Sequence, residues 1–379
     1  MSEEYLKVSN LSVSKNLYDF INNEALPNSG ISSNQFWRGL SSSLEILVPI
    51  NKKLLDDRRK LQLEIDRWHL NNNKNTFDLD GYETFLKKIG YLKKEGPDFK
   101  IKTKNLDEEI SNIPGPQLVV PISNSRYALN AVNARYQSLY DSLYGTDVIQ
   151  TEESASERYD PERGLEVIKY SKKFLDKFFT LKKKSWKDVI EIKIINKDLY
   201  LDTYKIKDQL KEPDKFIGYR GAKEKPSAII LKNNNLHVEI IINASAFSAK
   251  SDPAGISDII VEAAITTICD HEDSVAGVDA EDKINGYKNW LGLMKGDLKS
   301  KFEKKGKTYI RKLNPDRKFV KKDGSLSKLH GRALLLNRNV GHLMTNPCIL
   351  LKDGSEIPEG ILDAFVTSLC SMHDLKLKK

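Results

Sequence analysis

Short apolar runs recur at widely separated places along this chain. Ala333–Leu336 has four apolar residues without alternation, and Gln117–Ile122 and Ile265–Cys269 are of the same kind. Runs of this length without a polar face are typical of strands buried on both faces, as in a parallel sheet. A buried helical turn fits the same pattern at Ala333–Leu336, but that run is short and follows Gly331 closely. The pattern therefore favours a parallel sheet assembled from distant segments.

Other segments carry apolar residues at every third or fourth position, which is the period of a helix. The clearest is Pro49–His69, where Asp, Arg and Lys separate the apolar positions, and Asn71–Asn75 then interrupts the pattern. The same period predicts further helices at Tyr82–Leu92, Ala128–Tyr144, Arg163–Phe179 and Ile256–Ala264, from about Asp282 onward, and at Ile361–Leu369.

The middle of the chain has the signature of a β-rich module. Val189–Ile195 alternates apolar and polar residues, and Ala228–Lys232 and Leu236–Ile242 flank three consecutive asparagines. Two β runs around a short polar turn predict a hairpin. We therefore expect a small α/β module inserted between the segments of the parallel sheet.

Composition narrows the class of protein. The chain has 379 residues, 30% of them charged and 39% hydrophobic, as in soluble globular proteins of two or three domains. No apolar run approaches the ~18 residues of a membrane span, and the N-terminus lacks the apolar stretch of a secretory signal. Three cysteines without a CxxC pair indicate reduced thiols in a cytosolic protein rather than a disulfide or zinc framework.

The net charge of +8 does not identify a partner by itself. The lysines are spread along the chain and interleaved with acids, and no nucleic-acid recognition motif is present. Solubility is one explanation of the charge, and steering of a small anionic substrate is another. A nucleic-acid partner is disfavoured.

Two polar groups follow predicted strands and are candidates for chemistry. Arg338 stands two residues past Ala333–Leu336, and the C-terminal end of a barrel strand is where catalytic groups collect. An arginine there can bind a carboxylate through two parallel N–H groups or stabilise charge on a carbonyl oxygen, although a surface loop arginine fits equally. Asp270–Ser274 places three carboxylates directly after a strand, which suits either a magnesium-linked cluster or an exposed acidic turn.

Several long stretches go beyond such patterns. They are GPQLVVPISNSRYALNAVNARYQSLYDSLYGTD (115–147), DPAGISDIIVEAAITTICDHEDSVAGVDAEDK (252–283), NWLGLMKG (289–296), RKLNPDR (311–317) and GRALLLNRNVGHLMTNPCIL (331–350). These stretches resemble malate synthase G, the long single-chain malate synthase of bacteria. The N-terminal NEALPNSG, FWRGL and PINKKLLDDR match as well, so the resemblance covers essentially the whole chain in the order of the family.

The resemblance implies an α/β fold, namely an incomplete TIM (β/α)8 barrel with an N-terminal helical clasp and an inserted α/β domain. The family's enzyme is much longer and adds a C-terminal helical plug. The implied division is a clasp at 1–90, a linker at 91–114, a first barrel segment at 115–134, the inserted domain at 135–262, a barrel segment at 263–295, a return segment of the inserted domain at 296–330, and a truncated barrel segment at 331–379.

The resemblance also implies a reaction. Acetyl-CoA loses a methyl proton, the enolate attacks the aldehyde of glyoxylate, and the malyl-CoA thioester is hydrolysed to malate and CoA, with Mg²⁺ holding glyoxylate. The residue matching the family's catalytic arginine is Arg338, which contacts glyoxylate and stabilises the enolate oxygen. Asp270 and Glu272 match residues that line the metal site, through water or by orienting the arginine. The acetyl-CoA site corresponds to Val119, Arg126, Tyr127, Ser274 and Arg311, with Arg317 close to the last of these.

The chain departs from the family in one respect. The two direct metal ligands, a Glu and an Asp, and the catalytic base, another Asp, correspond to positions beyond residue 379, so no direct metal ligand is expected in this chain. Little or no activity is therefore expected from these residues alone. The alternative is a non-catalytic fragment that binds CoA or glyoxylate, or one half of a split enzyme that pairs with a C-terminal half. The family also implies a cytoplasmic monomer.

Overall fold

The computed structural model describes residues 4–72, 76–150, 159–304 and 306–377, which fold as two compact units. Unit 1 comprises residues 1–105, 270–296 and 338–379, and unit 2 comprises residues 106–269 and 297–337. Each unit is therefore assembled from segments that are far apart in the sequence.

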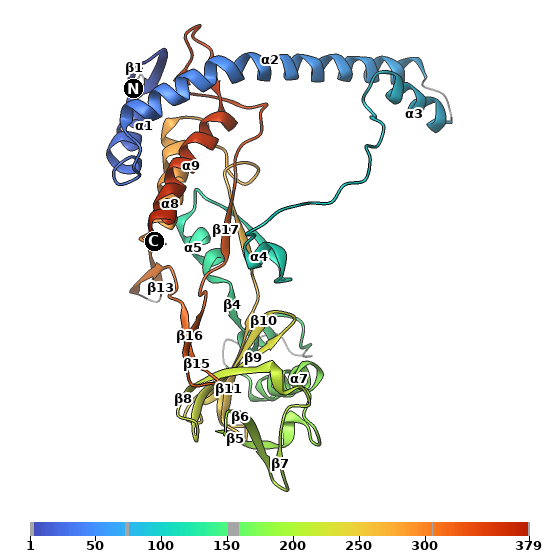
Figure 1. The fold of residues 1–379 in the computed structure, drawn as a ribbon, viewed down its shortest axis with the longest axis vertical. Helices are drawn as coiled ribbons and strands as arrows, with labels where there is room; N and C mark the ends of the chain where they lie inside the picture. Colours follow the sequence, from blue (N-terminus) through green and yellow to red (C-terminus); the bar gives the residue numbers. More distant parts are fainter. Residues whose placement is uncertain (1–3, 73–75, 151–158, 305, 378–379) are drawn as a thin grey trace. The chain divides into compact units, whose positions relative to one another are not determined.

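The longest element of unit 1 is α2 (Ser33–Asn71), one continuous helix in Figure 1. Ser32 and Gln35 form a capping box at its start. The predicted start at Pro49 is wrong, because Pro49 lies inside the helix. The N-terminal half of the helix carries its own apolar stripe, whose buried members recur every three or four residues from Trp37 onward. Burial of this stripe outweighs the hydrogen bond that the proline removes. Its buried members are Phe36, Trp37, Leu40, Leu44 and Val48.

Unit 1 also contains a four-stranded antiparallel sheet in the order β1-β2-β18-β19 and a pair of packed helices, α8 and α9. The helices predicted from Asp282 and at Ile361–Leu369 are confirmed by this pair, and the one predicted at Tyr82–Leu92 is confirmed by α3. The bounds are β1 Tyr5–Val8, β2 Leu11–Ser14, α1 Lys15–Phe20, a π-helix at Ile21–Ala25, α3 Leu79–Lys88, α8 Ala280–Lys295, β18 Thr345–Leu350, β19 Glu356–Pro358 and α9 Glu359–Leu377.

Unit 2 is dominated by a seven-stranded sheet in the order β16-β15-β8-β9-β10-β11-β4, in which neighbouring strands are antiparallel. A second, three-stranded sheet β5-β6-β7 and the helices α6 and α7 contribute to the same apolar core, in which Trp186 is fully buried. The bounds are β4 Tyr136–Ser138, α6 Leu139–Tyr144, α7 Pro161–Phe178, β5 Val189–Ile195, β6 Asp198–Thr203, β7 Lys207–Asp208, β8 Phe216–Gly221, β9 Pro226–Asn233, β10 Leu236–Ile242, β11 Ile256–Glu262, β15 Arg317–Lys321 and β16 Leu326–Leu329.

The predicted hairpin of the inserted module is confirmed as β9 and β10. Asn233 pairs with Leu236, so the loop is two residues long rather than three. Asn234 and Asn235 have φ values of 47° and 63°, which is the left-handed conformation that a type I′ turn requires and that asparagine tolerates.

Two predicted helices are wrong. Ala128–Tyr144 is not one helix, because β4 separates α5 (Ser125–Asn133) from α6. Ile256–Ala264 contains the strand β11, which pairs with β10 on one side and β4 on the other. β4 is only three residues long and lies between two helices, so a helical period appears to run through it, and β11 lacks a regular two-residue alternation. In both segments the pairing partners decide the conformation.

A third sheet has the order β17-β12-β3, from Leu334–Arg338, Thr266–Asp270 and Gln117–Pro121. Leu334 N donates to Ile265 O at one end of β17, and His271 N donates to Arg338 O at the other, so β12 and β17 run in parallel as predicted. Residues of β17 are half-buried, however, rather than buried on both faces. Among the described residues, these three strands form an open sheet. Unit 2 also contains α4 Glu108–Ser111, β13 Lys299–Lys304 and β14 Lys307–Lys312.

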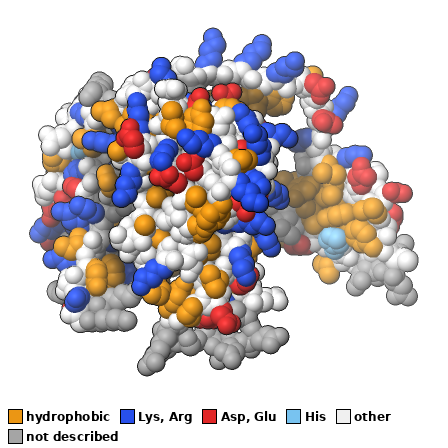
Figure 2. Space-filling model, turned by 90° about the horizontal axis from the view of Figure 1, so that it is seen from below, with side chains coloured by type: hydrophobic (Ala, Val, Ile, Leu, Met, Phe, Trp, Pro, Cys, Tyr) orange, Lys and Arg blue, Asp and Glu red, His pale blue; other side chains and the backbone are white. Residues whose placement is uncertain are grey.

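Lys and Arg side chains are dispersed over the face shown in Figure 2 and are mixed with acids and apolar groups, as their spacing in the sequence indicated. Cys269, Cys348 and Cys370 are all buried, and none of them forms a disulfide with another described residue. Among the described residues, none of the helices combines the length and the apolarity that crossing a bilayer requires.

The two-residue turn provides a direct test of the sheet register. Asn234→Val places a β-branched residue at positive φ and should destabilise the hairpin by about 1–2 kcal/mol. Asn233→Val, one residue earlier in β9, is the matched control and should change stability little. Hydrogen exchange of the β9 and β10 amides measures the opening free energy, and equal effects of the two variants would show that the turn is not type I′.

Candidate active site

The acidic turn after β12 is organised by its first residue, Asp270. This buried carboxylate accepts hydrogen bonds from the turn that follows: Oδ1 from Glu272 N at 2.9 Å, and Oδ2 from Ser274 N at 3.0 Å and Ser274 Oγ at 2.6 Å. An aspartate that caps its own backbone in this way is a standard means of ending a strand in a tight turn. The need for such a cap explains why this acid stands at the end of the strand.

Arg338 is the last residue of β17, the strand beside β12. Its Nε donates to Asp270 Oδ1 and its Nη2 to Asp270 Oδ2, each at 2.8 Å, so the pair is bidentate. Asp273 lies 3.2 Å from Nη1, and 38% of the arginine side chain is exposed. Asp270 therefore uses two of the five N–H groups of the guanidinium, and the exposed edge beside Asp273 can still donate to a ligand.

The pair has defined protonation states. Burial by itself would raise the pKa of Asp270, but hydrogen bonds from Arg338, Ser274 and the turn amides outweigh it and hold that pKa well below its usual range. The hydrogen bond to Asp270 raises the pKa of Arg338 further above its ordinary value. Asp270 is therefore an anion and Arg338 a cation throughout the physiological range, so neither is available as a proton-transfer group.

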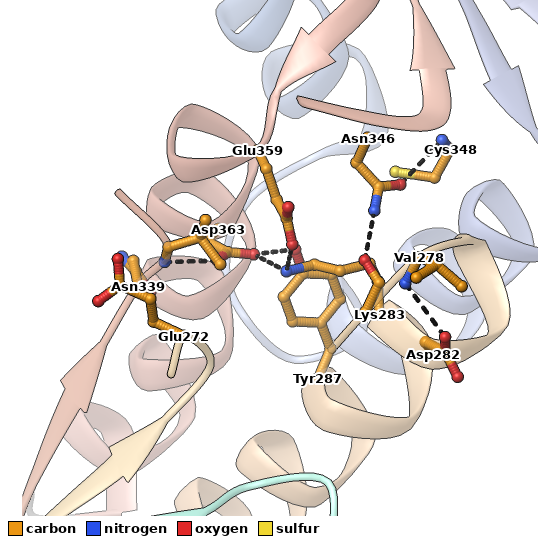
Figure 3. Close-up of polar contacts among 12 residues, drawn as sticks. Glu272, Val278, Asp282, Lys283, Tyr287, Asn339, Asn346, Cys348, Glu359 and Asp363 are labelled. Carbon is orange, nitrogen blue, oxygen red and sulfur yellow. Dashed lines mark hydrogen bonds and ion pairs between the residues drawn. The ribbon is translucent and has the colours of Figure 1, made fainter. Parts of the chain in front are cut away.

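The backbone after Arg338 is held by two further carboxylates that the sequence patterns did not single out for this role. Gly341 N donates to Glu272 Oε1 at 3.0 Å, and Val340 N donates to Asp363 Oδ2 at 3.0 Å. Asp363 belongs to α9 and is fully buried, and Figure 3 shows it beside Lys283 of α8. The signal that could have identified Asp363 was a charged residue at an otherwise apolar helix position, which requires a partner.

Four of the predicted acetyl-CoA residues belong to unit 2, and two of them meet at one aromatic ring. The guanidinium carbon of Arg126 lies 4.5 Å from the centroid of Phe302, and that of Arg311 lies 5.5 Å from it. Val119 and Tyr127 are each 55% exposed. No sequence pattern singled out Phe302, because its role as a shared platform depends on the packing of β13 on α5.

The structure separates Arg311 from its neighbour Arg317. Arg317 forms a bidentate pair with buried Glu239, at 2.6 Å from Nε to Oε1 and 2.5 Å from Nη2 to Oε2. It is therefore part of the sheet's internal charge pairing. The Arg311 guanidinium instead contacts the Phe302 ring.

Ser274 lies in unit 1 with Arg338, and its hydroxyl donates to Asp270. That hydrogen bond uses the only hydroxyl proton, so the side chain can offer a ligand acceptor lone pairs but no further donor. Its contribution in this structure is to the shape of the Asp270–Ser274 turn.

The acids of the turn do not form a magnesium site by themselves. Both oxygens of Asp270 already accept hydrogen bonds, and Glu272 Oε1 accepts one from Gly341. Within the described ranges, no group of three or more His, Cys, Asp or Glu side chains is arranged to hold a metal ion. Since Mg²⁺ requires near-octahedral oxygen ligation, these residues do not fit it as direct ligands, and orientation of Arg338 is the role that the contacts of Asp270 support.

A cavity of about 480 Å³ lies in unit 2, and its lining includes Arg135, His237 and Glu262 but none of the predicted site residues. Arg135 donates there to Glu262 at 2.7 Å and to Glu109 at 2.6 Å, and His237 Nδ1 lies 2.7 Å from Glu262. These polar groups satisfy one another and tie β10, β11 and α4 together, which is a structural role.

Comparison with known proteins places these features in a family. Residues 16–78 match the family model described as malate synthase, N-terminal domain, and residues 159–233 match the one described as malate synthase G, alpha-beta insertion domain. The second match falls on α7 and β5 to β9, which lie within residues 135–262, the predicted inserted domain.

Individual relatives extend the match to nearly all of the chain. Malate synthase G of Halalkalibacterium halodurans is 48% identical over 377 residues, which cover 98% of this chain and 52% of the relative. Malate synthase G of Corynebacterium glutamicum is 45% identical over 373 residues, covering 98% and 50% respectively. The chain spans about half the length of the curated relatives it matches. With these identities and both family models in order along it, the chain is similar to malate synthase G over nearly its whole length and fits the N-terminal half of these relatives.

Proposed function

We propose that this chain supplies the glyoxylate-binding arginine and part of the acetyl-CoA site for the malate synthase reaction. In that reaction the enolate of acetyl-CoA attacks the aldehyde of glyoxylate, and hydrolysis of the thioester gives malate and CoA. The proposal also places the catalytic base and the direct magnesium ligands outside these 379 residues. A cytoplasmic location and a monomeric state belong to the same proposal.

The observation that carries the proposal is the bidentate Asp270–Arg338 pair at the ends of two parallel strands. A guanidinium fixed along one edge keeps its other N–H groups in a set direction, which suits a planar carboxylate or an enolate oxygen. Such preorganised donors stabilise developing negative charge without having to reorient during the reaction. Arg338 would therefore bind the carboxylate of glyoxylate and stabilise the oxyanion.

The charge balance around Arg338 bears on the metal. Asp270, Glu272 and Asp273 place three carboxylates around one guanidinium, with distances of 2.8, 3.9 and 3.2 Å to its nitrogens. This excess of negative charge would repel an anionic substrate unless a cation lay nearby. The balance therefore supports a magnesium-dependent reaction, in which bound Mg²⁺ supplies a Lewis acid to glyoxylate while the described acids orient Arg338.

The acetyl-CoA side of the proposal rests on Arg126 and Arg311. Two guanidinium groups held at one aromatic ring form a compact positive platform, which suits the phosphates of CoA. Exposed Val119 and Tyr127 add apolar surface close in sequence to Arg126. We further propose that the sheet β17-β12-β3 belongs to a TIM barrel, with the domain bounds that the resemblance implied.

Substitution of Arg338 tests the glyoxylate site directly. Arg338→Lys keeps the charge but loses the bidentate geometry, and should weaken glyoxylate binding to the chain in the presence of Mg²⁺ by about tenfold or more. Arg58→Lys, on an exposed position of α2, is the matched control and should bind as the wild type does. Isothermal titration calorimetry measures both, and equal affinities would remove Arg338 from the site.

A turnover assay of the chain alone tests whether the catalytic base lies outside these residues. Without a positioned base the reaction loses roughly 10²–10⁴-fold, so the chain alone should release CoA from acetyl-CoA at the background rate even with glyoxylate and Mg²⁺. Detection of the free CoA thiol follows the reaction. Robust turnover dependent on glyoxylate would show that the base is among these residues.

The Asp270 pair should also make stability depend on pH. The folded-state pKa of Asp270 is depressed, so its ionised form stabilises the fold above about pH 4, and this contribution is lost as the pH falls through the folded pKa. Asp270→Asn should cost about 1–3 kcal/mol at pH 7, because an amide N–H then faces the guanidinium.

The difference between Asp270→Asn and the wild type should narrow toward pH 3, as followed by urea unfolding. Exposed Asp297→Asn provides the control, and its difference from the wild type should stay constant. A constant difference for Asp270→Asn between pH 7 and pH 3 would contradict the role assigned to the ionised pair.

A further inference from the structure

We propose that Asp363, held in place by Lys283, is a positioning residue that fixes the backbone of Asn339–Gly341 and through it the direction of Arg338. This inference rests on the proposed function of Arg338 and adds residues that the family resemblance did not assign. All of the groups concerned lie in unit 1.

Two carboxylates contact the main chain immediately after Arg338. Val340 N, two residues past Arg338, donates to Asp363 Oδ2, and the next amide, Gly341 N, donates to Glu272 Oε1. Two consecutive amides are thus held by carboxylates from different elements, α9 and the turn after β12. Asp270 fixes the guanidinium, whereas these two contacts fix the main chain from which the arginine side chain emerges.

Asp363 is itself held in place by residues of α8. Its Oδ1 lies 2.6 Å from Lys283 Nζ and accepts a hydrogen bond of 2.5 Å from Tyr287 Oη, which leaves Oδ2 for Val340. Lys283 also lies 2.7 Å from Glu359 Oε1. Figure 3 shows the ammonium group between the two carboxylates. Because Lys283 and Asp363 are almost completely buried, these partners are what compensates the loss of water around both charges.

One face of α9 contacts the loop that follows Arg338. Gly360, Asp363 and Thr367 lie on one helical face, at spacings of three and four residues. A Cβ at Gly360 would collide with Val340 O, so only glycine lets the loop approach this closely. Thr367 Oγ1 lies 3.3 Å from Asn339 Oδ1. The same face therefore contacts the loop at three successive turns of α9, with Asp363 as its charged member.

The alternative is that Lys283, Glu359 and Asp363 only hold α8 and α9 together. The two roles differ in what a substitution disturbs. A purely structural network would affect the two helices first, whereas a positioning role predicts that the loop and the guanidinium change while the helices stay protected.

The principal variant is Asp363→Asn. An asparagine at position 363 has only one oxygen, so it cannot accept hydrogen bonds on both sides as aspartate does. If its oxygen accepts from Val340 N–H, its NH₂ group faces the donors of Lys283 and Tyr287. If the amide is turned over, the NH₂ group faces the Val340 N–H instead. Lys283→Met removes the cation from the same network, and Lys288→Met, an exposed position of the same helix, is the matched control. The double variant Lys283→Met/Asp363→Asn tests whether Lys283 acts through Asp363.

Three measurements on the 379-residue chain distinguish the two roles. Hydrogen-exchange mass spectrometry of the peptide covering 339–344 reports the loop, and the same experiment on α8 and α9 reports the helices. The Nε–H resonance of Arg338 in a ¹⁵N-arginine sample, assigned with Arg338→Lys, reports the guanidinium. Titration with glyoxylate and Mg²⁺ reports the site.

We expect Asp363→Asn and Lys283→Met to speed exchange of the loop, to shift or broaden the Arg338 Nε–H signal, and to weaken glyoxylate binding by about tenfold, since small displacements of binding groups have large effects. The double variant should resemble the single ones, and Lys288→Met should resemble the wild type. Faster exchange confined to α8 and α9, with the Arg338 signal unchanged, would overturn the proposal.

Failure of the proposed function is distinguishable from failure of this inference. If the wild-type chain does not bind glyoxylate, the proposed function fails, and the loop exchange and the Arg338 signal decide the positioning role by themselves. If Lys283→Met does not fold, the Asp363→Asn variant, which keeps the shape of the side chain, carries the test alone.

Discussion

The bidentate pair between Asp270 and Arg338 is the constraint on which the geometry of the candidate site depends. A buried carboxylate is tolerated only when its lone pairs are used, and Asp270 meets this condition with two guanidinium N–H groups and the amides of its own turn. The turn and the arginine are therefore fixed by one group. Neither partner can exchange a proton near neutral pH, which assigns the pair to binding and electrostatics rather than to acid–base chemistry.

Other residues around this pair hold the loop that follows Arg338. Glu272 and Asp363 hold consecutive amides of the loop that follows Arg338, and Asp363 is in turn held by Lys283 and Tyr287. The arrangement resembles that of many binding sites, in which the groups that touch the ligand are oriented by others that do not. It also explains why charged residues occupy buried positions of α8 and α9, where apolar side chains would pack at lower cost.

The inserted module is stabilised by an apolar core and charge pairs of its own. Its antiparallel sheet buries a continuous apolar core with Trp186 inside it, and Glu239 of β10 pairs with both Arg220 and Arg317. None of these residues is a candidate for chemistry. The pairing of Arg317 leaves Arg126 and Arg311 as the guanidinium groups at Phe302, and this is the feature that connects unit 2 to the proposed acetyl-CoA site.

The sequence by itself determined the strands β3, β12 and β17, the β9–β10 hairpin though not the length of its turn, most of the helices, and the position of Arg338 at a strand end next to an acidic turn. It could do so because local periodicity, turn chemistry and long motifs carry that information. Only the tertiary structure decided that Pro49 lies inside α2, that Ile256–Glu262 is a strand, and that Arg317 is tied up in an ion pair whereas Arg311 contacts the Phe302 ring. It alone also joined Lys283 to Asp363, since pairing between residues so far apart in the chain leaves no trace in local pattern. The physical reason is common to all of these: burial and charge pairing depend on which segments meet, and periodicity describes only the segment itself.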